Sequence, residues 1–481
     1  MFALSHRPTW KNLLLLFFVA FAVRAGTFFF YVQHEERYRQ ADSNDYHVGA
    51  LTMGLGAGMV KIHNGQPVFW RTPGYPLYLS LFYRYFGIKT ADFAGNMPAQ
   101  KAALWVQILL CSLIPLILFF LALSLTGSLP IAWITSWISA VHLGLILASS
   151  FLLTEGLTLI FFYLFLLFFY KSFTCYGESH KSGHWVWYIA GSALSLGIAT
   201  WIRPMGQFVA IVCALIIALL GKDGWKLKSK KIFLFLLIFF GSIAPWYVRN
   251  YKLTGKPFFC PMFGLYLNSF VAPKILRSLY GVPFQKGWKH LQEAAQTKAI
   301  AQMPIAQASG KYLVLEDISG EVAWPIVLAH PWYAFTAWMP EVIKSTFDLY
   351  STQLTAFANN CWKWDPLEEF LPEKLAECLY SKPMPITMRL IAWFELLCSL
   401  ALWISLLIGA WRFVLSPLFH RFKVAPSIQA TAALWVKTGL LIGAVLFMTG
   451  GFGYARLRLP IEPLMIILAL TVWFPIKTKP E

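Results

Sequence analysis

Charged residues are scarce in this sequence. Asp, Glu, Lys and Arg together make up 13% of its 481 residues, against roughly 25% in a soluble protein. Hydrophobic residues make up 58% and aromatic residues 17%, and the mean hydropathy is +0.58. So little charge excludes an ordinary soluble domain. The composition indicates an all-α polytopic membrane protein.

Patterns typical of metal-binding and disulfide-rich proteins are also missing. The seven cysteines show no paired spacing, which argues against a disulfide scaffold or a zinc site. The ten histidines show no HExxH or paired-ligand spacing, so a metal role for His47 or His63 is disfavoured. Cys361 and Cys378 share one external region, and whether they pair is left open. We expect no resident metal site. Whether a divalent cation assists the chemistry is left open.

Acidic residues are fewer than basic ones, which gives a formal net charge of +18. No stripe of Lys and Arg interleaved with aromatic residues lies on a polar domain, so the excess does not indicate a nucleic-acid partner. Much of it lies in short loops beside apolar runs, where it marks topology and attracts anionic membrane lipids. The sequence has no Asn-x-Ser/Thr sequon, which favours a bacterial inner (plasma) membrane over the endoplasmic reticulum.

About ten apolar segments have a length near that needed to cross a bilayer. They cover approximately residues 13–32, 102–126, 130–148, 151–170, 186–202, 205–220, 232–248, 387–411, 431–450 and 459–475. The first is too long for a signal peptide and lacks a small-residue cleavage site, so it is expected to stay as a helix.

Basic residues orient these segments. If the N-terminus with Arg7 and Lys11 is cytoplasmic, every further short basic loop falls on the same side, and both termini are cytoplasmic. The external side then receives the loop 33–101, the long region 249–386 and the turn 451–458. The active site is therefore expected on the external, periplasmic face.

Ionisable residues gather at the external ends of the segments. They are Asp42, Asp45 and Arg71 in the first loop, Glu155 at the start of the fourth segment, Arg203 after the fifth, Arg249 after the seventh, and Tyr454, Arg456 and Arg458 before the tenth. Such residues are costly at membrane depth and by default mark a site. Arginines hold phosphate bidentately, and a carboxylate takes a proton from a hydroxyl or amine nucleophile. A lipid-linked phosphosugar fits both properties.

Several of these residues have a purely structural alternative. The stretch from Asp42 to Asp45 is also ordinary turn chemistry. Glu155 fits an acid at a helix start, stabilised by the helix dipole. Arg203 fits the cap of a helix broken by the next proline, and Arg458 fits an interfacial side chain that reaches toward the headgroups.

The motifs in chain order are Asp42-x-x-Asp45-Tyr46, Arg71-Thr72-Pro73-Gly74-Tyr75-Pro76-Leu77, Thr154-Glu155, Arg203-Pro204, Pro245-Trp246-Tyr247-Val248-Arg249-Asn250 and Tyr454-x-Arg456-x-Arg458-x-Pro460. Together they resemble the GT-C superfamily of integral-membrane glycosyltransferases. The resemblance is greatest to the branch that contains protein O-mannosyltransferases and the lipid A aminoarabinose transferase. It covers the whole chain, although each motif by itself is weak.

This resemblance implies a GT-C-like helix bundle, a polyprenyl-phosphate-linked sugar donor and inversion at the anomeric carbon. The acceptor, a lipid, glycan or protein, would be met at the outer face. The resemblance also implies a catalytic Asp in the first external loop, and Asp42 takes that position as general base. Many relatives have Asp-Glu there, whereas this chain has Asp42-Ser43. Asp45 either substitutes for the second acid or belongs to a simple helix start. Arg71, Glu155, Tyr454 and the other arginines are expected to bind the donor's lipid phosphate.

The chain divides into three parts by composition. Residues 1–248 form a transmembrane catalytic module that includes the loop 33–101, and residues 387–481 form C-terminal transmembrane helices. The external region 249–386 is less apolar and is expected to be a mostly helical region that shapes the acceptor site. Within it, 330–347 is predicted to be an amphipathic helix at the interface, anchored by tryptophans.

Two other classes of function remain alternatives. A transporter or flippase of a lipid-linked or anionic solute would need discontinuous helices at the membrane midplane and internally repeated halves, and no repeat is found. For a non-catalytic scaffold of an envelope pathway, the convergent acids and arginines would be superfluous.

Overall fold

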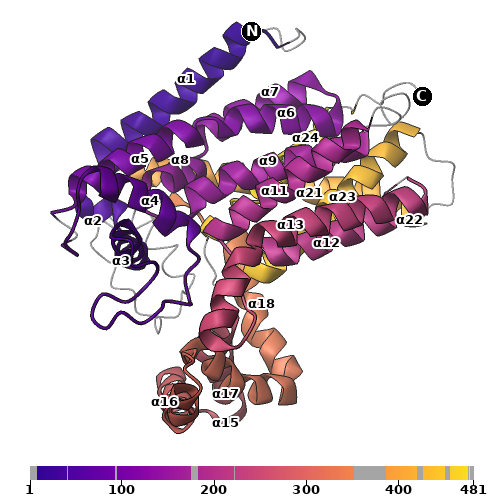
Figure 1. Cartoon of the computed structure of the whole chain (residues 1–481). Coiled ribbons are helices and arrows are strands. Elements are labelled where there is room, and N and C mark those ends of the chain that lie inside the picture. The colour runs from indigo at the N-terminus through magenta and orange to yellow at the C-terminus, as the bar shows by residue number, and fades with distance from the viewer. Residues whose placement is uncertain are drawn as a thin grey trace.

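The computed structural model describes residues 8–40, 42–92, 95–174, 183–221, 223–351, 386–419, 426–449, 455–474 and 476. Within these ranges the regular structure is helical, and the extended pairing is limited to an isolated bridge between Val60 and Pro67 (Figure 1). The prediction of an all-α polytopic protein is confirmed.

Each predicted apolar segment overlaps a helix or a pair of consecutive helices in the part of the chain that the structure describes. Seven spans are long and apolar enough to cross a membrane: Trp10–Val32, Met97–Thr126, Glu155–Phe173, His184–Ile202, Trp225–Thr254, Ile386–Leu415 and Ile428–Met448. They contain, in order, α1 (Trp10–Thr27), α5 (Met97–Cys111) with α6 (Ile114–Thr126), α9 (Glu155–Thr174), α11 (His184–Ile202), α13 (Trp225–Thr254), α21 (Ile386–Gly409) and α23 (Pro426–Thr449). The pair α7 (Leu129–Val141) and α8 (Leu143–Ser150) is also long and apolar enough when taken together, but it bends by 49°, as in a broken span or a re-entrant loop.

Two of the predicted segments form shorter helices. The helix α12 (Gly206–Leu220) has 15 residues and α24 (Glu462–Trp473) has 12. At about 1.5 Å per residue, both are shorter than the roughly 30 Å hydrocarbon core of a bilayer. Both begin close to arginines that the sequence places in the candidate site, Arg203 and Arg458.

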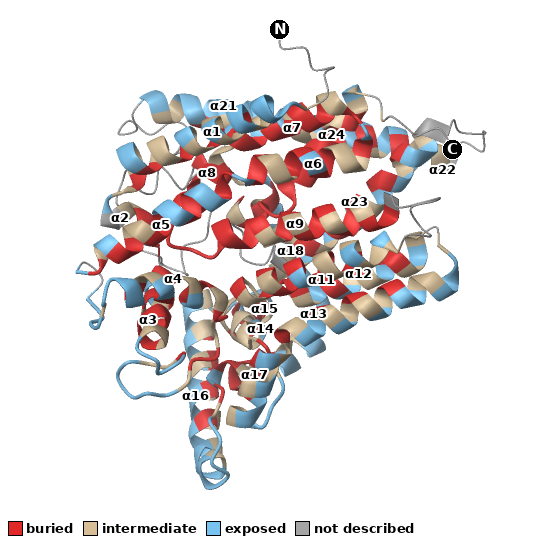
Figure 2. Cartoon of the chain, turned by 45° about the horizontal axis from the view of Figure 1, so that its top comes forward, coloured by how far each residue is buried: buried red, intermediate tan, exposed pale blue. Residues whose placement is uncertain are grey.

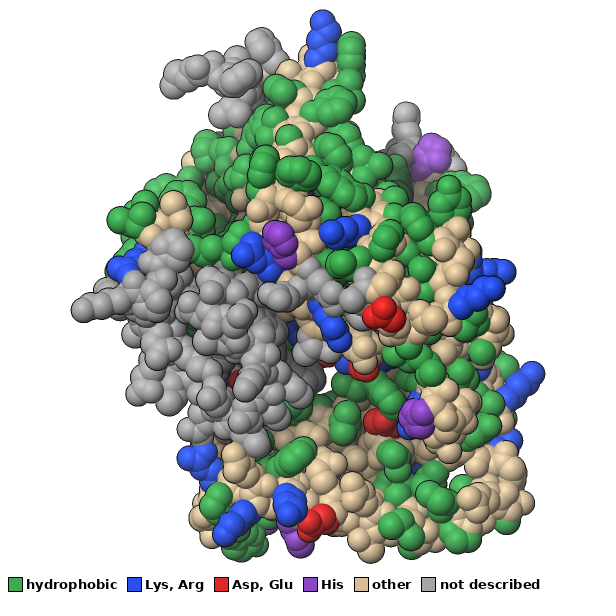
Figure 3. All heavy atoms as spheres, turned by 90° about the vertical axis from the view of Figure 1, so that its left-hand side faces the viewer, with side chains coloured by type: hydrophobic (Ala, Val, Ile, Leu, Met, Phe, Trp, Pro, Cys, Tyr) green, Lys and Arg blue, Asp and Glu red, His purple; other side chains and the backbone are tan. Residues whose placement is uncertain are grey.

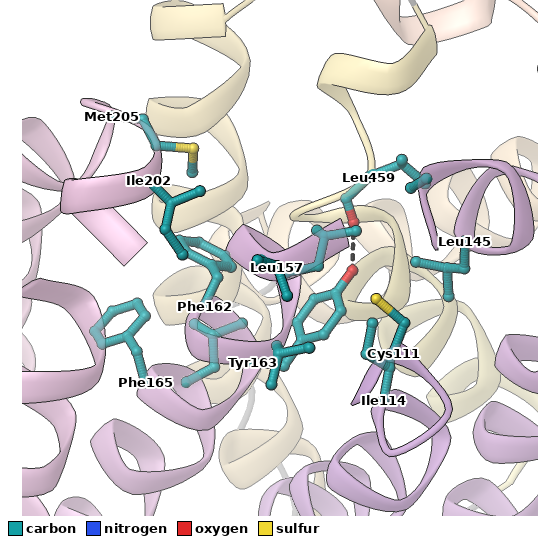
Figure 4. Close-up of a cluster of buried hydrophobic side chains, with 14 of the residues drawn as sticks. Cys111, Ile114, Leu145, Leu157, Phe162, Tyr163, Phe165, Ile202, Met205 and Leu459 are labelled. Carbon is teal, nitrogen blue, oxygen red and sulfur yellow. Dashed lines mark hydrogen bonds between the residues drawn. The ribbon is translucent and has the colours of Figure 1, made fainter. Parts of the chain in front are cut away.

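The helix α9 lies at the centre of the bundle. In its most apolar stretch 78% of the residues are buried, against 22% in α1 and 6% in α21 (Figure 2). Figure 4 shows its side chains Leu157, Phe162, Tyr163 and Phe165 packed among residues of neighbouring helices. Because α9 is enclosed by protein and α1 and α21 expose apolar side chains, the outer helices are the ones that face lipid.

A break between α8 and α9 sets where α9 begins. The side-chain amide of Gln107, on α5, donates to the carbonyls of Ser149 and Phe151, each at 3.0 Å. The hydroxyl of Ser43 donates to the Leu152 carbonyl at 2.9 Å. Unpaired carbonyls inside an apolar bundle are costly, so these bonds hold the irregular stretch before Glu155 in one conformation.

At the other bend, between α7 and α8, an arginine donates hydrogen bonds to the backbone carbonyls. Arg24 is fully buried on α1 and donates to the carbonyls of Ala140, at 2.9 Å, and Ser139, at 3.2 Å. These carbonyls lie in the last turn of α7, where the helix leaves such acceptors without intrahelical partners. Arg24 is the only charged residue of the run 13–32, and the sequence predictions gave it no role.

The loop 33–101 carries three helices at one end of the bundle. They are α2 (Glu35–Tyr38), α3 (Ser43–Gly54) and α4 (Gly74–Tyr85). The helices α3 and α4 pack against each other beside the ends of α5 and α8 (Figure 1).

The region after α13 forms a helical lobe, as predicted for the part of 249–386 that the structure describes. It contains α14 (Met262–Tyr266), α15 (Ala272–Tyr280), α16 (Phe284–Ala308), α17 (Leu315–Ala329) and α18 (Pro331–Phe347). On α18 the rings of Trp332 and Phe335 stack, and Trp338 contacts Phe447 at the end of α23 with ring centroids 4.7 Å apart. The interfacial position of α18 stays a prediction. Cys361 and Cys378 lie outside the described residues.

Candidate active site

Five segments that are distant in sequence bring charged side chains together. They are the start of α3, the loop before α4, the start of α9, the end of α11 and the short turn Ala455–Leu457. Figure 3 views the side on which α3 and α4 lie and shows acidic and basic side chains gathered around a hollow. We call this group of Asp42, Asp45, Arg71, Glu155, Arg203 and Arg456 the charged cluster.

Arg71 joins the two aspartates of the first loop. Its Nη2 donates to Asp42 Oδ1 at 2.7 Å and its Nε donates to Asp45 Oδ2 at 2.9 Å. The indole N–H of Trp70 also donates to Asp45 Oδ2, at 3.3 Å. Asp42 is the N-cap residue of α3, but its carboxylate makes no capping bond. The residue therefore occupies a helix-start position while its side chain is committed to the cluster.

Glu155 receives two arginines from the other direction. It is buried as the first residue of α9, and its Oε1 lies 3.0 Å from Arg203 Nη1. The Nε of Arg456 lies 3.6 Å from the same oxygen, and Arg456 Nη2 lies 3.7 Å from Asp42 Oδ2. Arg456 thus links the aspartate side of the cluster to the glutamate side.

The loop that carries Arg71 is docked against the end of α11. The hydroxyl of Thr72 donates to the Ile202 carbonyl at 2.7 Å. A Cβ atom at Gly74 would lie 2.6 Å from the Trp201 carbonyl carbon and oxygen. Only glycine allows this approach of backbone to backbone, which places Arg71 near the end of the helix that leads to Arg203.

Gly74→Ala is therefore expected to displace this loop and lower both the melting temperature in detergent and the transfer activity. Forcing an extra carbon into packed backbone typically costs about 1–3 kcal/mol. Gly241→Ala is the matched control, because nothing lies within 4 Å of its added Cβ. That variant should melt at or slightly above the wild-type temperature, since alanine favours helix by up to about 1 kcal/mol. A Gly74→Ala protein that melts like Gly241→Ala would contradict the docking argument.

The arginines keep Asp42 ionised. Burial alone raises the pKa of its carboxyl. The charges of Arg71, Arg456 and Arg203 and the hydrogen bond from Arg71 have a larger, opposite effect, so the pKa lies below its ordinary value. Asp42 is therefore a carboxylate at neutral pH and accepts rather than donates a proton.

A narrow pocket lies beside the cluster. It is lined by Glu155, Thr158, Leu159, Arg203, Met205, Arg456, Leu457, Leu459 and Pro460. Figure 4 shows Met205, Ile202 and Leu459 above the apolar side chains of α9. The pocket thus combines two guanidinium groups with an apolar floor, which suits the junction of an anionic head and a hydrocarbon chain.

Two of the predicted site residues that the structure describes, Arg249 and Arg458, do not join the cluster. Arg249 stacks on the rings of Trp246 and Phe69 and donates to the carbonyls of Val68 and Met59, each at 3.3 Å. Arg458 is buried and turns to the other side of the chain, toward Glu462. Tyr454 lies outside the described residues. The predicted phosphate-binding roles of Arg249 and Arg458 remain predictions, and the contacts give both a structural role.

Comparisons with known proteins bear on the fold. A family model described as dolichyl-phosphate-mannose-protein mannosyltransferase matches residues 80–254, less than half of the chain. The structure of the oligosaccharyltransferase AglB from Archaeoglobus fulgidus, in complex with an inhibitory peptide and a dolichol-phosphate, is similar with a TM-score of 0.53 at 12% identity. The alignment covers 96% of this chain and 51% of AglB, and the apo form of that enzyme gives a TM-score of 0.54.

The chain has the GT-C glycosyltransferase fold. The resemblance found in the motifs is thereby confirmed, although this GT-C chain spans only about half the length of the archaeal enzyme. ArnT from Cupriavidus metallidurans bound to undecaprenyl phosphate aligns over 95% of this chain and 79% of its own, at 14% identity, but its TM-score of 0.39 is too low to support an argument. No curated protein matches the sequence.

The carboxylates of the charged cluster are paired with arginines. Among the described residues, no three His, Cys, Asp or Glu side chains converge as potential ligands. Asp42 and Asp45 both turn an oxygen to the same guanidinium group, which would repel a cation placed between them.

Some residues that support the charged cluster were not predicted from the sequence. Trp70 binds Asp45, and Gln107 holds the stretch before Glu155. Trp70 adjoins Arg71 in the sequence, and this position could have indicated a role beside the site. Gln107 is a polar residue inside an apolar run, and such residues in membrane helices usually have a partner.

Proposed function

We propose that this protein is a glycosyltransferase that moves a sugar from a polyprenyl-phosphate-linked donor to an acceptor at the outer face of the membrane, with inversion and with Asp42 as general base. The observation that carries the proposal is the pocket in which Arg203 and Arg456 stand over an apolar floor next to Asp42. The GT-C fold and the mannosyltransferase family match support the same class of donor.

In the proposed reaction the acceptor oxygen attacks the anomeric carbon of the donor sugar. The bond from that carbon to the phosphate oxygen breaks, and the polyprenyl phosphate leaves with the electron pair. Attack from the face opposite the phosphate inverts the anomeric configuration. The acceptor proton passes to Asp42, for which we assign Oδ2, since this oxygen lies 3.7 Å from Arg456, beyond hydrogen-bond distance.

The charges of the cluster fit the change in phosphate charge during this reaction. Three carboxylates (Asp42, Asp45, Glu155) face three guanidinium groups (Arg71, Arg203, Arg456), so the group is balanced before a donor binds. The donor is a phosphodiester with one negative charge, and the product is a phosphomonoester with up to two. Arg456, which lies 3.6 Å from Glu155 and 3.7 Å from Asp42, is placed between the carboxylates and the proposed phosphate site and would turn to the phosphate as its charge grows.

One experiment would identify both the acceptor and the sugar. Purified protein is incubated with polyprenyl-phosphate sugars and a membrane lipid extract, and the products are analysed by mass spectrometry. We expect the mass increment of one sugar on an acceptor that appears only with a lipid-phosphate donor. Transfer from a nucleotide sugar in place of the lipid-linked one would overturn the proposal.

The proposed site faces the exterior, which predicts how cysteine variants are labelled. In a cysteine-free background, an impermeant thiol reagent added to intact cells should label Asn64→Cys and not Lys226→Cys. Both positions are exposed; Asn64 lies between α3 and α4, and Lys226 lies in the first turn of α13. After permeabilisation both should react. The reverse pattern in intact cells would show that the topology is inverted.

A further inference from the structure

A second group of buried polar residues lies directly behind the charged cluster. Glu462 Oε1 is 3.3 Å from Arg458 Nη2 and 3.5 Å from His142 Nε2, and the hydroxyl of Tyr350 donates to Glu462 Oε2. The chain between the two groups is the stretch 455–462. Arg456 points from it to the charged cluster, and Arg458 points to Glu462.

The turn that carries Arg456 is tied to the end of α18. The carboxylate of Asp348, which follows α18, accepts a hydrogen bond from the Ala455 N–H at 3.1 Å. In the other direction, Arg458 Nη1 donates to the carbonyls of Ser345, at 3.2 Å, and Asp348, at 3.1 Å. Burial raises the pKa of Asp348 to about 6, so its carboxyl is mostly ionised at neutral pH and keeps this acceptor role.

We propose that Asp348 and Arg458 are positioning residues for Arg456, through which the end of the acceptor-side helix α18 fixes the guanidinium that binds the donor phosphate. The inference rests on the proposed function, because it takes Arg456 as a phosphate ligand. It gives Arg458 a role without any contact to the donor.

The contacts of Arg456 itself explain why its backbone matters. Its side chain lies 3.6 Å from Glu155 Oε1 and 3.7 Å from Asp42 Oδ2. The place of the guanidinium relative to these carboxylates also depends on the backbone that carries it, which is the turn Ala455–Leu457. A third tie, the Tyr163 hydroxyl bonded to the Leu459 carbonyl at 2.6 Å, holds the far side of the turn (Figure 4).

The arrangement joins the two halves of the proposed reaction. The helix α18 belongs to the region assigned to the acceptor, and Arg456 belongs to the donor pocket. A ligand that shifts the end of α18 therefore shifts the turn and its guanidinium. Donor affinity then depends on the acceptor-side region even though α18 itself need not contact the donor.

The test uses Asp348→Ala in the full-length protein, with Glu395→Gln as matched control. Glu395 accepts hydrogen bonds from the N–H groups of Tyr350 and Ser351, so it holds the residues that follow Asp348. Undecaprenyl phosphate affinity is measured for each variant in the wild-type and in the Arg456→Lys background. Hydrogen exchange of the amides in 455–459 is measured without ligand.

We expect Asp348→Ala to speed exchange in 455–459 and to weaken binding about tenfold, the size of effect expected from losing a hydrogen bond to a charged group. In the Arg456→Lys background the same change should have little further effect, because coupled residues are not additive. Arg458→Lys should behave likewise, and Glu395→Gln should leave exchange in 455–459 unchanged.

Two results would overturn the inference: unchanged exchange in Asp348→Ala, or an equal loss of affinity in both backgrounds, which would mark a merely structural role. A wild-type protein that does not bind undecaprenyl phosphate would instead count against the proposed donor. The exchange measurement, which needs no ligand, would still decide whether Asp348 holds the turn.

Discussion

Asp42→Asn is expected to lower turnover by about a hundred- to ten-thousandfold, the range that a positioned general base contributes. The asparagine keeps the shape of the side chain and can still accept a hydrogen bond from Arg71, but it cannot take up the acceptor proton. Donor affinity and membrane insertion should stay near wild type. The measurement is single-turnover transfer with saturating donor, together with undecaprenyl phosphate binding.

Asp45→Asn is the comparison for this prediction. Asp45 shares Arg71 with Asp42 but also binds the Trp70 indole, so its loss should loosen the loop and have a milder effect on turnover. The base is wrongly assigned if Asp42→Asn keeps most of its activity while Asp45→Asn or Glu155→Gln abolishes it.

The lowered pKa of Asp42 also fixes the sign of a pH effect. Its ordinary value is about 4, and the folded value is lower, so the carboxylate stays ionised from pH 8 down to pH 5. Its ionic contacts add stability above pH of about 4, and this contribution is lost as the pH falls through the folded pKa. A fall in transfer rate between pH 8 and pH 5 should therefore have the same midpoint in wild type and in Asp42→Asn.

Arg203→Lys and Arg456→Lys are each expected to weaken the binding of donor and of undecaprenyl phosphate by about 1.5–3 kcal/mol, the contribution of a charge-assisted hydrogen bond. Lysine keeps the charge but loses the planar fork that holds two phosphate oxygens. Isothermal titration in detergent measures the change. Because both arginines also contact Glu155, the melting temperature is recorded for each variant.

Arg249→Lys separates two interpretations of the arginines. The contacts of Arg249 hold the loop that contains Met59 and Val68, so the variant should lose thermal stability more than affinity. An equal loss of affinity in all three variants would extend the phosphate site to Arg249, as the sequence predicts. Unchanged affinity in Arg203→Lys and Arg456→Lys would leave these two residues with a structural role at helix ends.

The fold follows largely from the sequence, because the length of an apolar segment depends on local composition. The ten segments were predictable for that reason. The start of α9 was not: residues 151–154 are apolar enough to continue a helix, and what stops them is a set of bonds from Gln107 and Ser43, which are distant in the chain. Such tertiary contacts leave no periodic pattern.

The site was predictable as a set of residues and not as a geometry. Ionisable side chains at helix ends stand out in an apolar chain, which is how Asp42, Glu155, Arg203 and Arg456 were found. Which arginine faces which acid depends on the direction of each side chain. Arg456 and Arg458 are two residues apart and point to different groups of acids. The sequence spacing predicts this difference only when the conformation of the turn between them is known.

The two short helices have a consequence for where the reaction occurs. If the far end of α12 is level with the headgroups on its side, its first residue lies about 8 Å inside the hydrocarbon layer on the other, from 15 residues at about 1.5 Å each against roughly 30 Å. The α24 helix, with 12 residues, begins deeper still. Arg203 and Arg456 would then lie below the headgroup plane on that side of the membrane. A polyprenyl phosphate, the proposed donor group, would have to move down to this depth to reach them, and membrane thickness would affect how readily it binds.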